Sequence, residues 1–344
     1  MIPYEKLLVF TQAVLEKTGL DSEKSKHITE ILVEGELLGH RTHGLQLLAD
    51  YVRELEGNLM EKEGDYVILN DFKSILAIDG KYLPGPYLVN EAIEQCIKRV
   101  EDFGLATVTI QRCHHIACLA AYLEKVTKLN YMILIAASDP RNKTIAPFGG
   151  MTAVYSPNPW AIGIPTKAEP ILIDISMSVT SNALVARSHR NHEKLPHKWL
   201  LDQNGEATDD PSTFFESPPS TILPLGGMDV GYKGFGLGLM VEALTNGLGG
   251  HGRSESPSRW GCSVFIQIID PQRFGGVDSF LNESEFLKNE CLNSKPADEK
   301  RPIRMPGIRG LELKKQQLVN GVELLEETEN ALIKLGSQYD LNFS

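Results

Sequence analysis

The chain has 344 residues, 42% of them hydrophobic and 23% charged, and a formal net charge of −11 at pH 7. This acidic balance argues against a nucleic-acid backbone or an anionic membrane as a partner, although a small anionic substrate responds to a local field instead. No run approaches the ~20 apolar residues that a membrane span needs, and the short N-terminal apolar run is amphipathic, unlike a secretory signal. We therefore expect a cytoplasmic protein of ordinary enzyme composition, long enough for two domains.

Residues 3–57 carry the apolar spacing of three helices. Asp21 or Ser22 can cap the second helix, and Thr42 can cap the third, which would place His43 in a first turn. A chain that opens with three helices differs from the usual dinucleotide-binding fold, which opens with a strand, a glycine turn and a helix.

From about residue 73 the pattern alternates between strands and helices. Strands are expected at 74–79, 106–110, 132–137, 161–165, 171–174 and 263–269, and helices at 86–100, 119–126, 278–292 and 311–335. The polar stretch that ends near residue 224 is expected to be loop, with its three histidines, His189, His192 and His197, in solvent.

Two adjacent histidines, His114 and His115, join the strand at 106–110 to the helix that follows. Open α/β sheets often keep their chemistry at such a junction, and the free N–H groups of a helix start disfavour protonation of a histidine. In the simplest interpretation, one histidine caps the turn and the other packs in the core. The segment His40–Gly44 places a further histidine, His43, at a helix start. That repetition favours a functional pair of His43 and His115, while His114 should point elsewhere.

The five cysteines are odd in number and show no C-x-x-C spacing, so they are expected to be free thiols in a reducing compartment. Cys113 and Cys118 flank the two adjacent histidines but lack the paired spacing of a structural zinc site. We therefore expect no metal site there.

A glycine-rich segment, Gly234–Val241, has glycines at i, i+2 and i+4 and follows no strand, so it is not the G-x-G-x-x-G motif. A buried helix with small residues explains it better. Lys233 precedes it, and a cation beside a tight backbone turn suits a phosphate or a carboxylate.

These features occur in an order that resembles the malate/L-lactate dehydrogenase family, which also holds ureidoglycolate, sulfolactate and diketogulonate enzymes. The similarity covers nearly the whole chain. The matching segments are Gly39–Gly44 with Tyr51–Val52, Cys113–Ile116, Ala146–Gly150, Asn158–Ile162, Asp174, Leu195–Asp202, Tyr232–Leu237 and Met305–Gly307.

The resemblance implies an α/β (α+β) fold of the sulfolactate-dehydrogenase type, without a classical Rossmann arrangement. A helical domain would be built from residues 1–72 and 293–344, and a central α/β domain with a largely antiparallel sheet from residues 73–292. The resemblance also implies a homodimer with sites near the subunit contact.

The family's acid/base histidine corresponds here to His43 or His115, and the sequence leaves open which of them it is. The implied substrate contacts are Arg41, Thr42 and Lys233. The implied cofactor contacts are Asp139, Asp174, Ile175, Ser176, Lys233, Gly307, Ile308 and Arg309.

Several positions depart from the family pattern. T-N-S reads Ala137–Asp139, D-M-A-T-S reads Asp174–Ser178, and Ala117 replaces a glycine. Leu47 stands where many members have an arginine, which bears on the size of the substrate.

Reduction of a 2-oxo acid needs a hydride donor, a proton donor and a cation for the carboxylate. We predict an NAD(P)-dependent oxidoreductase that interconverts a 2-hydroxy acid of the malate or lactate type and its 2-oxo acid. Asp139 predicts NADH over NADPH, because a carboxylate repels a 2′-phosphate. Two alternatives stay open: reduction of a cyclic imino acid, and a paralogue that binds a nucleotide or metabolite without turnover.

Overall fold

The computed structural model describes residues 1–343, which form two compact units. The first unit contains Met1–Ile135, Ala161–Asp174 and the chain from Ile266 onward, and the second contains Ala136–Trp160 and Ile175–Phe265. The division proposed from the sequence groups the chain by type of element instead, and it stays a prediction.

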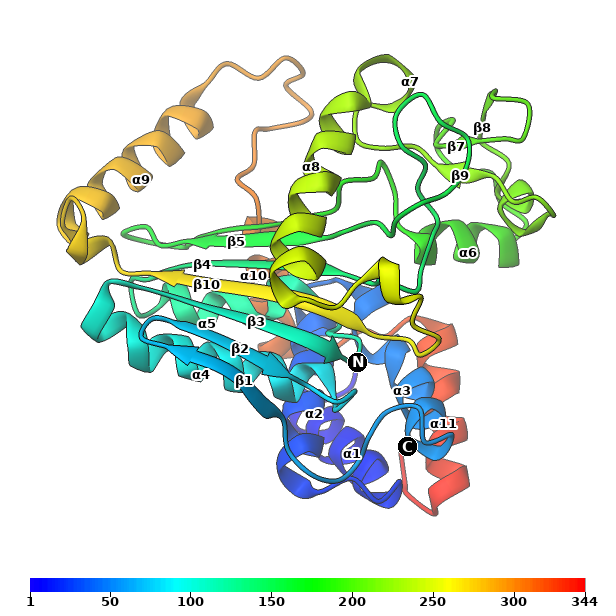
Figure 1. Ribbon diagram of the computed structural model, residues 1–344, viewed down its shortest axis with the longest axis horizontal. Helices are drawn as coiled ribbons and strands as arrows, with labels where there is room; N and C mark the ends of the chain where they lie inside the picture. Colours follow the sequence, from blue (N-terminus) through cyan, green and yellow to red (C-terminus); the bar gives the residue numbers. More distant parts are fainter. Residues whose placement is uncertain (344) are drawn as a thin grey trace. The chain divides into compact units, whose positions relative to one another are not determined.

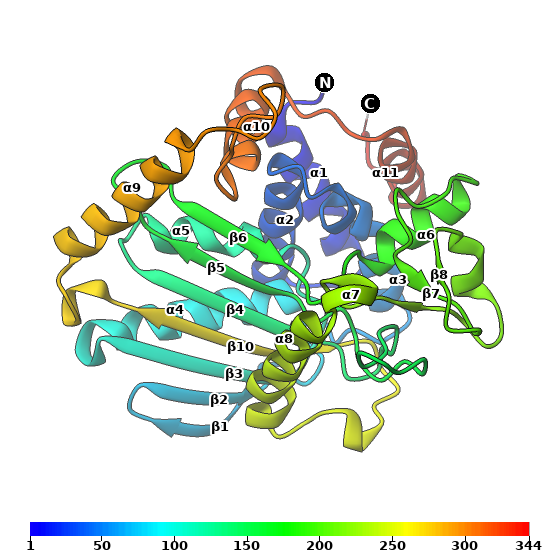
Figure 2. The same ribbon diagram turned by 90° about the horizontal axis from the view of Figure 1, so that it is seen from above.

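A seven-stranded mixed sheet, most of which belongs to the first unit, has the order β1-β2-β3-β10-β4-β5-β6 (Figure 2). Its strands are β1 (Val67–Phe72), β2 (Ile75–Asp79), β3 (Leu105–Cys113), β4 (Met132–Ser138), β5 (Trp160–Ile164), β6 (Ile171–Ile175) and β10 (Cys262–Ile269). Strands β1 and β2 are antiparallel, whereas β2 and β3 are parallel. The predicted α/β class is confirmed, and the edge strand β1 is an addition that the sequence reading did not include.

Helix α4 (Gly85–Phe103) makes the crossover that the parallel pair β2 and β3 requires. It lies with α5 (Leu123–Thr127) on one face of the sheet (Figure 1). Gly104, in the left-handed region at φ 77°, ends α4 and turns the chain into β3. The predicted strand–helix–strand succession is therefore confirmed, and it delivers His114 and His115 at the end of β3.

Helices from both ends of the chain pack together in the first unit. They are α1 (Tyr4–Lys17), α2 (Ser22–Leu37), α3 (Leu48–Glu56), α10 (Ile308–Asn320) and α11 (Glu326–Tyr339). Helix α1 contacts α2 and α11, and α10 also packs on α2. Asp21 caps α2 as predicted, since its side chain accepts a hydrogen bond from the Lys24 N–H at 2.8 Å.

The second unit holds a small sheet of order β8-β7-β9 and three α-helices, besides short 3₁₀ and π segments. The elements are α6 (Asn182–Arg190), β7 (Leu200–Leu201), β8 (Ala207–Thr208), β9 (Thr221–Ile222), α7 (Gly227–Val230) and α8 (Tyr232–Glu242). Helix α8 is the predicted glycine-rich helix, but it is not buried throughout, because Leu239 is 53% exposed and Met240 41% exposed. Its buried line is Gly234, Gly238 and Val241.

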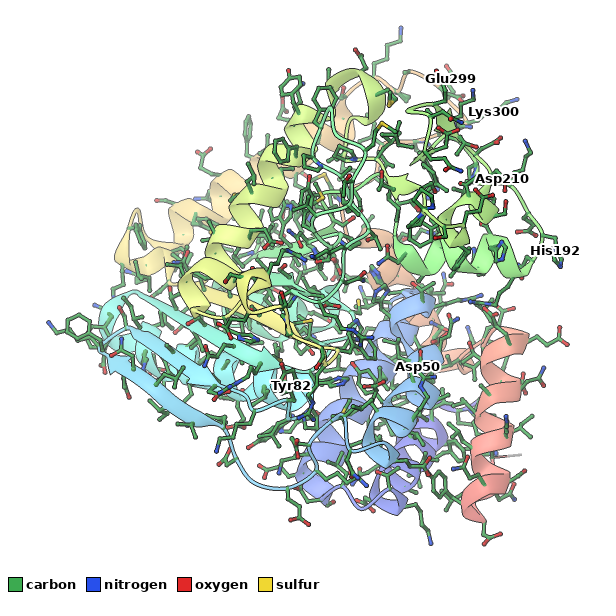
Figure 3. The ribbon with its side chains drawn as sticks, turned by 45° about the vertical axis from the view of Figure 1, so that its right-hand side comes forward. Asp50, Tyr82, His192, Asp210, Glu299 and Lys300 are labelled. Atoms are coloured by element: carbon green, nitrogen blue, oxygen red, sulfur yellow. The ribbon has the colours of Figure 1, made fainter. Side chains whose placement is uncertain are left out.

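Three local predictions were wrong. Helix α3 begins at Leu48, and Thr42 caps no helix, because Arg41–His43 and Leu45–Leu47 form two short 3₁₀ turns. The helix expected at 311–335 is interrupted by Gly321, whose φ of 90° ends α10. The stretch up to residue 224 is not all loop, since it contains α6 and the small sheet. The expectation that His192 faces solvent is confirmed (Figure 3).

Candidate active site

The turn that carries His43 packs directly on helix α2. The side chain of Glu36 accepts a hydrogen bond from the Leu45 N–H at 3.2 Å. A Cβ at Gly44 would lie 2.6 Å from that carboxylate, and a Cβ at Gly35 would lie 3.0 Å from the carbonyl oxygen of His43. A side chain at Gly44 would overlap Glu36, and one at Gly35 would crowd the His43 carbonyl, so the two glycines let the turn lie close to α2.

The segment that carries His115 is held by the start of α4 and by Tyr51 of α3. A Cβ at Gly85 would lie 2.2 Å from the carbonyl oxygen of His115, which makes glycine necessary there. The Tyr51 hydroxyl donates to that same carbonyl at 2.8 Å and lies 3.1 Å from Nδ1 of the ring. The Ala117 N–H also points at Nδ1, at 3.4 Å.

Ala117 adopts φ 57°, in the left-handed region that favours glycine. This is the position at which the sequence departs from the family's glycine. An L residue in this conformation carries backbone strain.

The rings of His43 and His115 lie together, with centroids 6.0 Å apart and planes inclined by 28°. The expected proximity of the two histidines is thus observed. Burial lowers the pKa of His43 and lowers the pKa of His115 well below its ordinary value of 6.5. Burial, and not the helix start expected from the sequence, is the main cause of both shifts.

The charge of Asp174 acts on the pKa of His43 and so makes the two rings different. Its negative charge opposes the fall in the pKa of His43, whereas the neighbouring His43 and His114 lower the pKa of His115 further. Asp174 lies in β6 and accepts a hydrogen bond from the Ala120 N–H at 2.9 Å. Of the two imidazoles, His43 is the one that takes up a proton more readily.

His114 lies in the core beside helix α3. Its side chain is fully buried, and its Nε2 lies 3.5 Å from a carboxylate oxygen of Glu54 on α3. Replacing His114 would therefore disturb the core, and an exposed histidine such as His192 is the better control.

The remaining predicted residues of the first unit lie in two places. Thr42 Oγ1 is 3.0 Å from Nδ1 of His43, and Arg41 is 3.4 Å from Glu323. Gly307, at φ 86°, packs its backbone on Leu172 of β6 and precedes α10. Ile308 and Arg309 begin that helix, and Arg309 is exposed without an ion-pair partner among residues 1–343.

The predicted residues of the second unit are Asp139, Ile175, Ser176 and Lys233. Asp139 follows β4, and its Oδ1 accepts hydrogen bonds from the backbone N–H groups of Arg141 at 3.0 Å and Asn142 at 3.2 Å. Burial raises the pKa of Asp139 to about 6. Lys233 is exposed at the start of α8 and has no ion-pair partner in the described part of the chain.

Ser176 lies in a short hydroxyl chain, with its Oγ 3.0 Å from that of Ser178. Ile175, the last residue of β6, is 40% exposed. The first unit thus brings His43, His115 and Asp174 together, and the second carries the candidate cofactor residues Asp139, Ser176 and Lys233.

Two residues that position the site were not identified from the sequence. One is Glu36, whose place beside Gly35 on the buried face of α2 was a usable signal. The other is Arg253, which donates to the Asn142 carbonyl at 2.7 Å and to Glu242 at 2.7 Å and so anchors the Asp139 loop. Nothing in the local sequence around Arg253 indicates a contact more than a hundred positions away.

Residues 2–333 match the model of the family described as malate/L-lactate dehydrogenase, and the chain belongs to that family of NAD(P)-dependent dehydrogenases. It is accordingly an oxidoreductase of the class that acts on a CH–OH group.

Particular relatives make the likeness concrete. A malate dehydrogenase of Pyrococcus abyssi is 26% identical over 339 residues, which cover 96% of this chain and 92% of the relative. The sulfolactate dehydrogenase structure from Methanocaldococcus jannaschii matches with a TM-score of 0.86 at 24% identity, over 99% of this chain and 98% of that one. The delta1-piperideine-2-carboxylate reductase structure from Pseudomonas syringae pvar. tomato matches with a TM-score of 0.85 at 22% identity, over 97% and 99%. The predicted sulfolactate-dehydrogenase-like fold is confirmed.

Among residues 1–343, no helix combines the length and the apolar character that crossing a bilayer requires.

Because Glu36 is buried, the stability of the folded protein should depend on pH, and Glu36→Gln should remove that dependence. Glu36 is 1% exposed, and burial raises its pKa from 4.5 to about 7. The folded protein therefore binds more protons than the unfolded chain between those values, so its stability falls as pH rises through them. A glutamine still accepts from the Leu45 N–H but does not titrate. Between pH 4.5 and pH 8, the free energy of unfolding of wild type should fall by about 3 kcal/mol relative to that of the variant. Urea titrations at each pH measure this difference.

The exposed Glu30 of the same helix provides the control, because Glu30→Gln should leave the pH dependence unchanged. A constant difference between Glu36→Gln and wild type over this range would contradict the assignment.

Proposed function

We propose that this protein is an NAD(P)-dependent oxidoreductase that interconverts a 2-hydroxy acid and its 2-oxo acid, with a histidine as general acid and base. The observation that carries the proposal is the pair of His43 and His115 rings, 6.0 Å apart, with Asp174 acting on His43. The named activity of the Pyrococcus abyssi relative, malate dehydrogenation, supports the same reaction class.

The pair can divide the work of proton transfer. In the oxidation direction, the neutral imidazole of His43 accepts the hydroxyl proton, and Asp174 stabilises the imidazolium that forms. Nδ1 of His115 lies 3.1 Å from the Tyr51 hydroxyl and 3.4 Å from the Ala117 nitrogen, which leaves Nε2 for the substrate. Nε2 can form a hydrogen bond with the substrate oxygen, and Tyr51 holds the ring in place.

The residues present fit a nicotinamide dinucleotide. When bound, the cofactor supplies or accepts the hydride. Asp139 uses Oδ1 for its own loop, which leaves Oδ2 to accept from ribose hydroxyls. Lys233 and Arg309 are cations at helix starts without ion-pair partners in residues 1–343, and such positions suit anionic groups.

For the substrate carboxylate we assign Arg41 and Lys233 as the candidate cations, with Thr42 beside His43. Arg41 is within 3.4 Å of an exposed carboxylate, Glu323, an ion pair weak enough to be exchanged for a substrate. Leu47 offers no charge, and this favours a substrate whose side chain is small or apolar.

Reduction of a cyclic imino acid is the second candidate function, because the same proton donors can serve a C=N bond. It is favoured by the shared fold of the Pseudomonas reductase, which is named for such a substrate. A paralogue without turnover is the third candidate. The altered segments Ala137–Asp139 and Asp174–Ser178 motivate it, and the intact histidine pair argues against it.

A substrate panel separates the three candidates. The loss of NADH fluorescence would be followed with pyruvate, oxaloacetate and larger 2-oxo acids, and then with a cyclic imine. We expect turnover with a 2-oxo acid. Turnover with the cyclic imine alone would favour the second candidate. NADH binding without turnover of any compound would favour the third candidate.

In the same panel we expect NADH to exceed NADPH in kcat/KM by at least about tenfold at pH 8, because the Asp139 carboxylate opposes a 2′-phosphate. The preference should weaken below about pH 6, where Asp139 is protonated. Asp139→Asn should narrow it at pH 8, whereas Asp202→Asn, in an exposed turn, should not. An equal or NADPH-favouring ratio in wild type would refute the assignment.

His43→Asn and His115→Asn should each lower kcat/KM, and the loss of the proton-transfer group should cost roughly 10² to 10⁴ in kcat. NADH binding, measured by fluorescence, should persist. Because both pKa values are lowered, the acid limb of oxidation should lie below pH 6.5, and Asp174→Asn should move it lower still. His192→Asn is the matched control, and wild-type kcat/KM in both variants of the pair would overturn the mechanism.

We propose a homodimer in the cytoplasm. The exposed apolar side chains of α8 and its extension, Leu239, Met240 and Leu248, form a surface suited to a second copy. Light scattering should give twice the chain mass, and Leu239→Glu should shift the protein toward the monomer. A fully active monomer at assay concentration would contradict the dimer, and cell fractionation tests the location.

A further inference from the structure

Three potential metal ligands converge within the first unit. An imidazole nitrogen of His40, Sγ of Cys118 and a carboxylate oxygen of Asp174 all lie within 4.8 Å of one another. They come from three separate segments: the turn after α2, the residue before the 3₁₀ turn Leu119–Tyr122, and β6. No local sequence spacing brings them together, so only the fold creates the set.

The chemistry of the set is that of a thiophilic divalent cation. Thiolate, imidazole and carboxylate are the ligands of Zn²⁺, at about 2.3, 2.0 and 2.1 Å. Tetrahedral bonds of that length separate ligand atoms by roughly 3.5 Å, so small side-chain rotations would close the site. Three protein ligands leave one position for water, and Mg²⁺, which prefers oxygen, finds a poor match.

None of the three side chains forms an ion pair among residues 1–343, although Cys118 is buried at 2% exposure. The imidazole of His40 makes no hydrogen bond among residues 1–343. Cys118 Sγ lies 3.8 Å from Asp174 Oδ2, as a thiol donating to the carboxylate. Oδ2 also accepts from the Ala120 N–H at 2.9 Å, a bond that would orient the carboxylate as an outer-shell contact does in metal sites.

We propose that His40, Cys118 and Asp174 form an inhibitory site for a thiophilic divalent cation such as Zn²⁺. Binding replaces the thiol proton with a sulfur–metal bond and releases that proton to solvent, with no change in oxidation state. The ion engages Asp174, which lies beside His43 and which the family resemblance also implies as a cofactor contact, so inhibition should be competitive with NADH. This consequence rests on the proposed function, but the binding itself does not.

Cadmium provides a direct probe of binding, because a cadmium–thiolate bond gives a charge-transfer band in the ultraviolet. Titration of the full-length protein with Cd²⁺ should give this band with a stoichiometry of one. Cys118→Ser should abolish it, and His40→Ala should weaken binding on the order of 10- to 100-fold. Cys291→Ser is the matched control and should keep the band, since Cys291 is the one cysteine of the five that is not buried.

A band that persists in Cys118→Ser, or no band in wild type after several equivalents of Cd²⁺, would overturn the site. Should Cys118→Ser fail to fold by circular dichroism, His40→Ala decides instead, and unchanged affinity there overturns it. Mg²⁺ at the same concentration should not compete with Cd²⁺.

The inhibitory role has its own test, which applies once a substrate is known. Zn²⁺ should raise the apparent KM for NADH, a chelator should restore it, and His40→Ala should require on the order of tenfold more Zn²⁺. Cadmium binding without any effect of Zn²⁺ on KM or kcat would overturn inhibition and leave the site. Absence of dehydrogenase activity would overturn the proposed function and leave the cadmium result standing.

Discussion

The hydrogen bond from the Tyr51 hydroxyl to the backbone carbonyl of His115 is the contact on which the rest of the candidate site depends. It joins helix α3 to the end of strand β3, across 64 positions of sequence. Because α3 follows directly on the turn that carries His43, the same bond sets the spacing of the two imidazoles. The surrounding glycines then remove every side chain that would keep these backbones apart.

This arrangement also accounts for the electrostatics of the pair. Burial favours the neutral form of both imidazoles, and the neighbouring His43 lowers the pKa of His115 further. A single carboxylate, Asp174, breaks the symmetry in favour of His43. A charged partner beside one ring of two is a simple way to give otherwise equivalent groups different roles.

Much of the fold could be predicted from the sequence, because its longest elements are local. Helix α4 has the 3.6-residue apolar spacing and a glycine at its end, β3 alternates apolar and polar residues, and β4 is a continuous apolar run. The failures were also physical. The chain from Arg41 to Leu47 is divided into two 3₁₀ turns at Gly44, whose backbone (φ −100°, ψ −138°) is not helical, and the small sheet of the second unit has strands of two residues.

The candidate residues could be named from motifs, but not the contacts that tune them. The pairing of His43 with His115 follows from two recognisable segments, while Glu36 and Arg253 act through hydrogen bonds that no spacing encodes. The pKa direction of His115 was anticipated for a different cause, since burial appears only once the chain is folded.

The left-handed backbone of Ala117 links the ring of His115 to the shape of its loop. Its N–H meets the ring at Nδ1, so the imidazole helps to hold a conformation that an alanine alone disfavours by roughly 1–3 kcal/mol. If the ring rotates away, this hydrogen bond is lost, and the strained backbone of the loop can relax to another conformation. With a glycine at this position, the loop conformation would not depend on the position of the ring. With alanine at this position, the conformation of the segment depends on the hydrogen bond between the Ala117 N–H and the His115 ring.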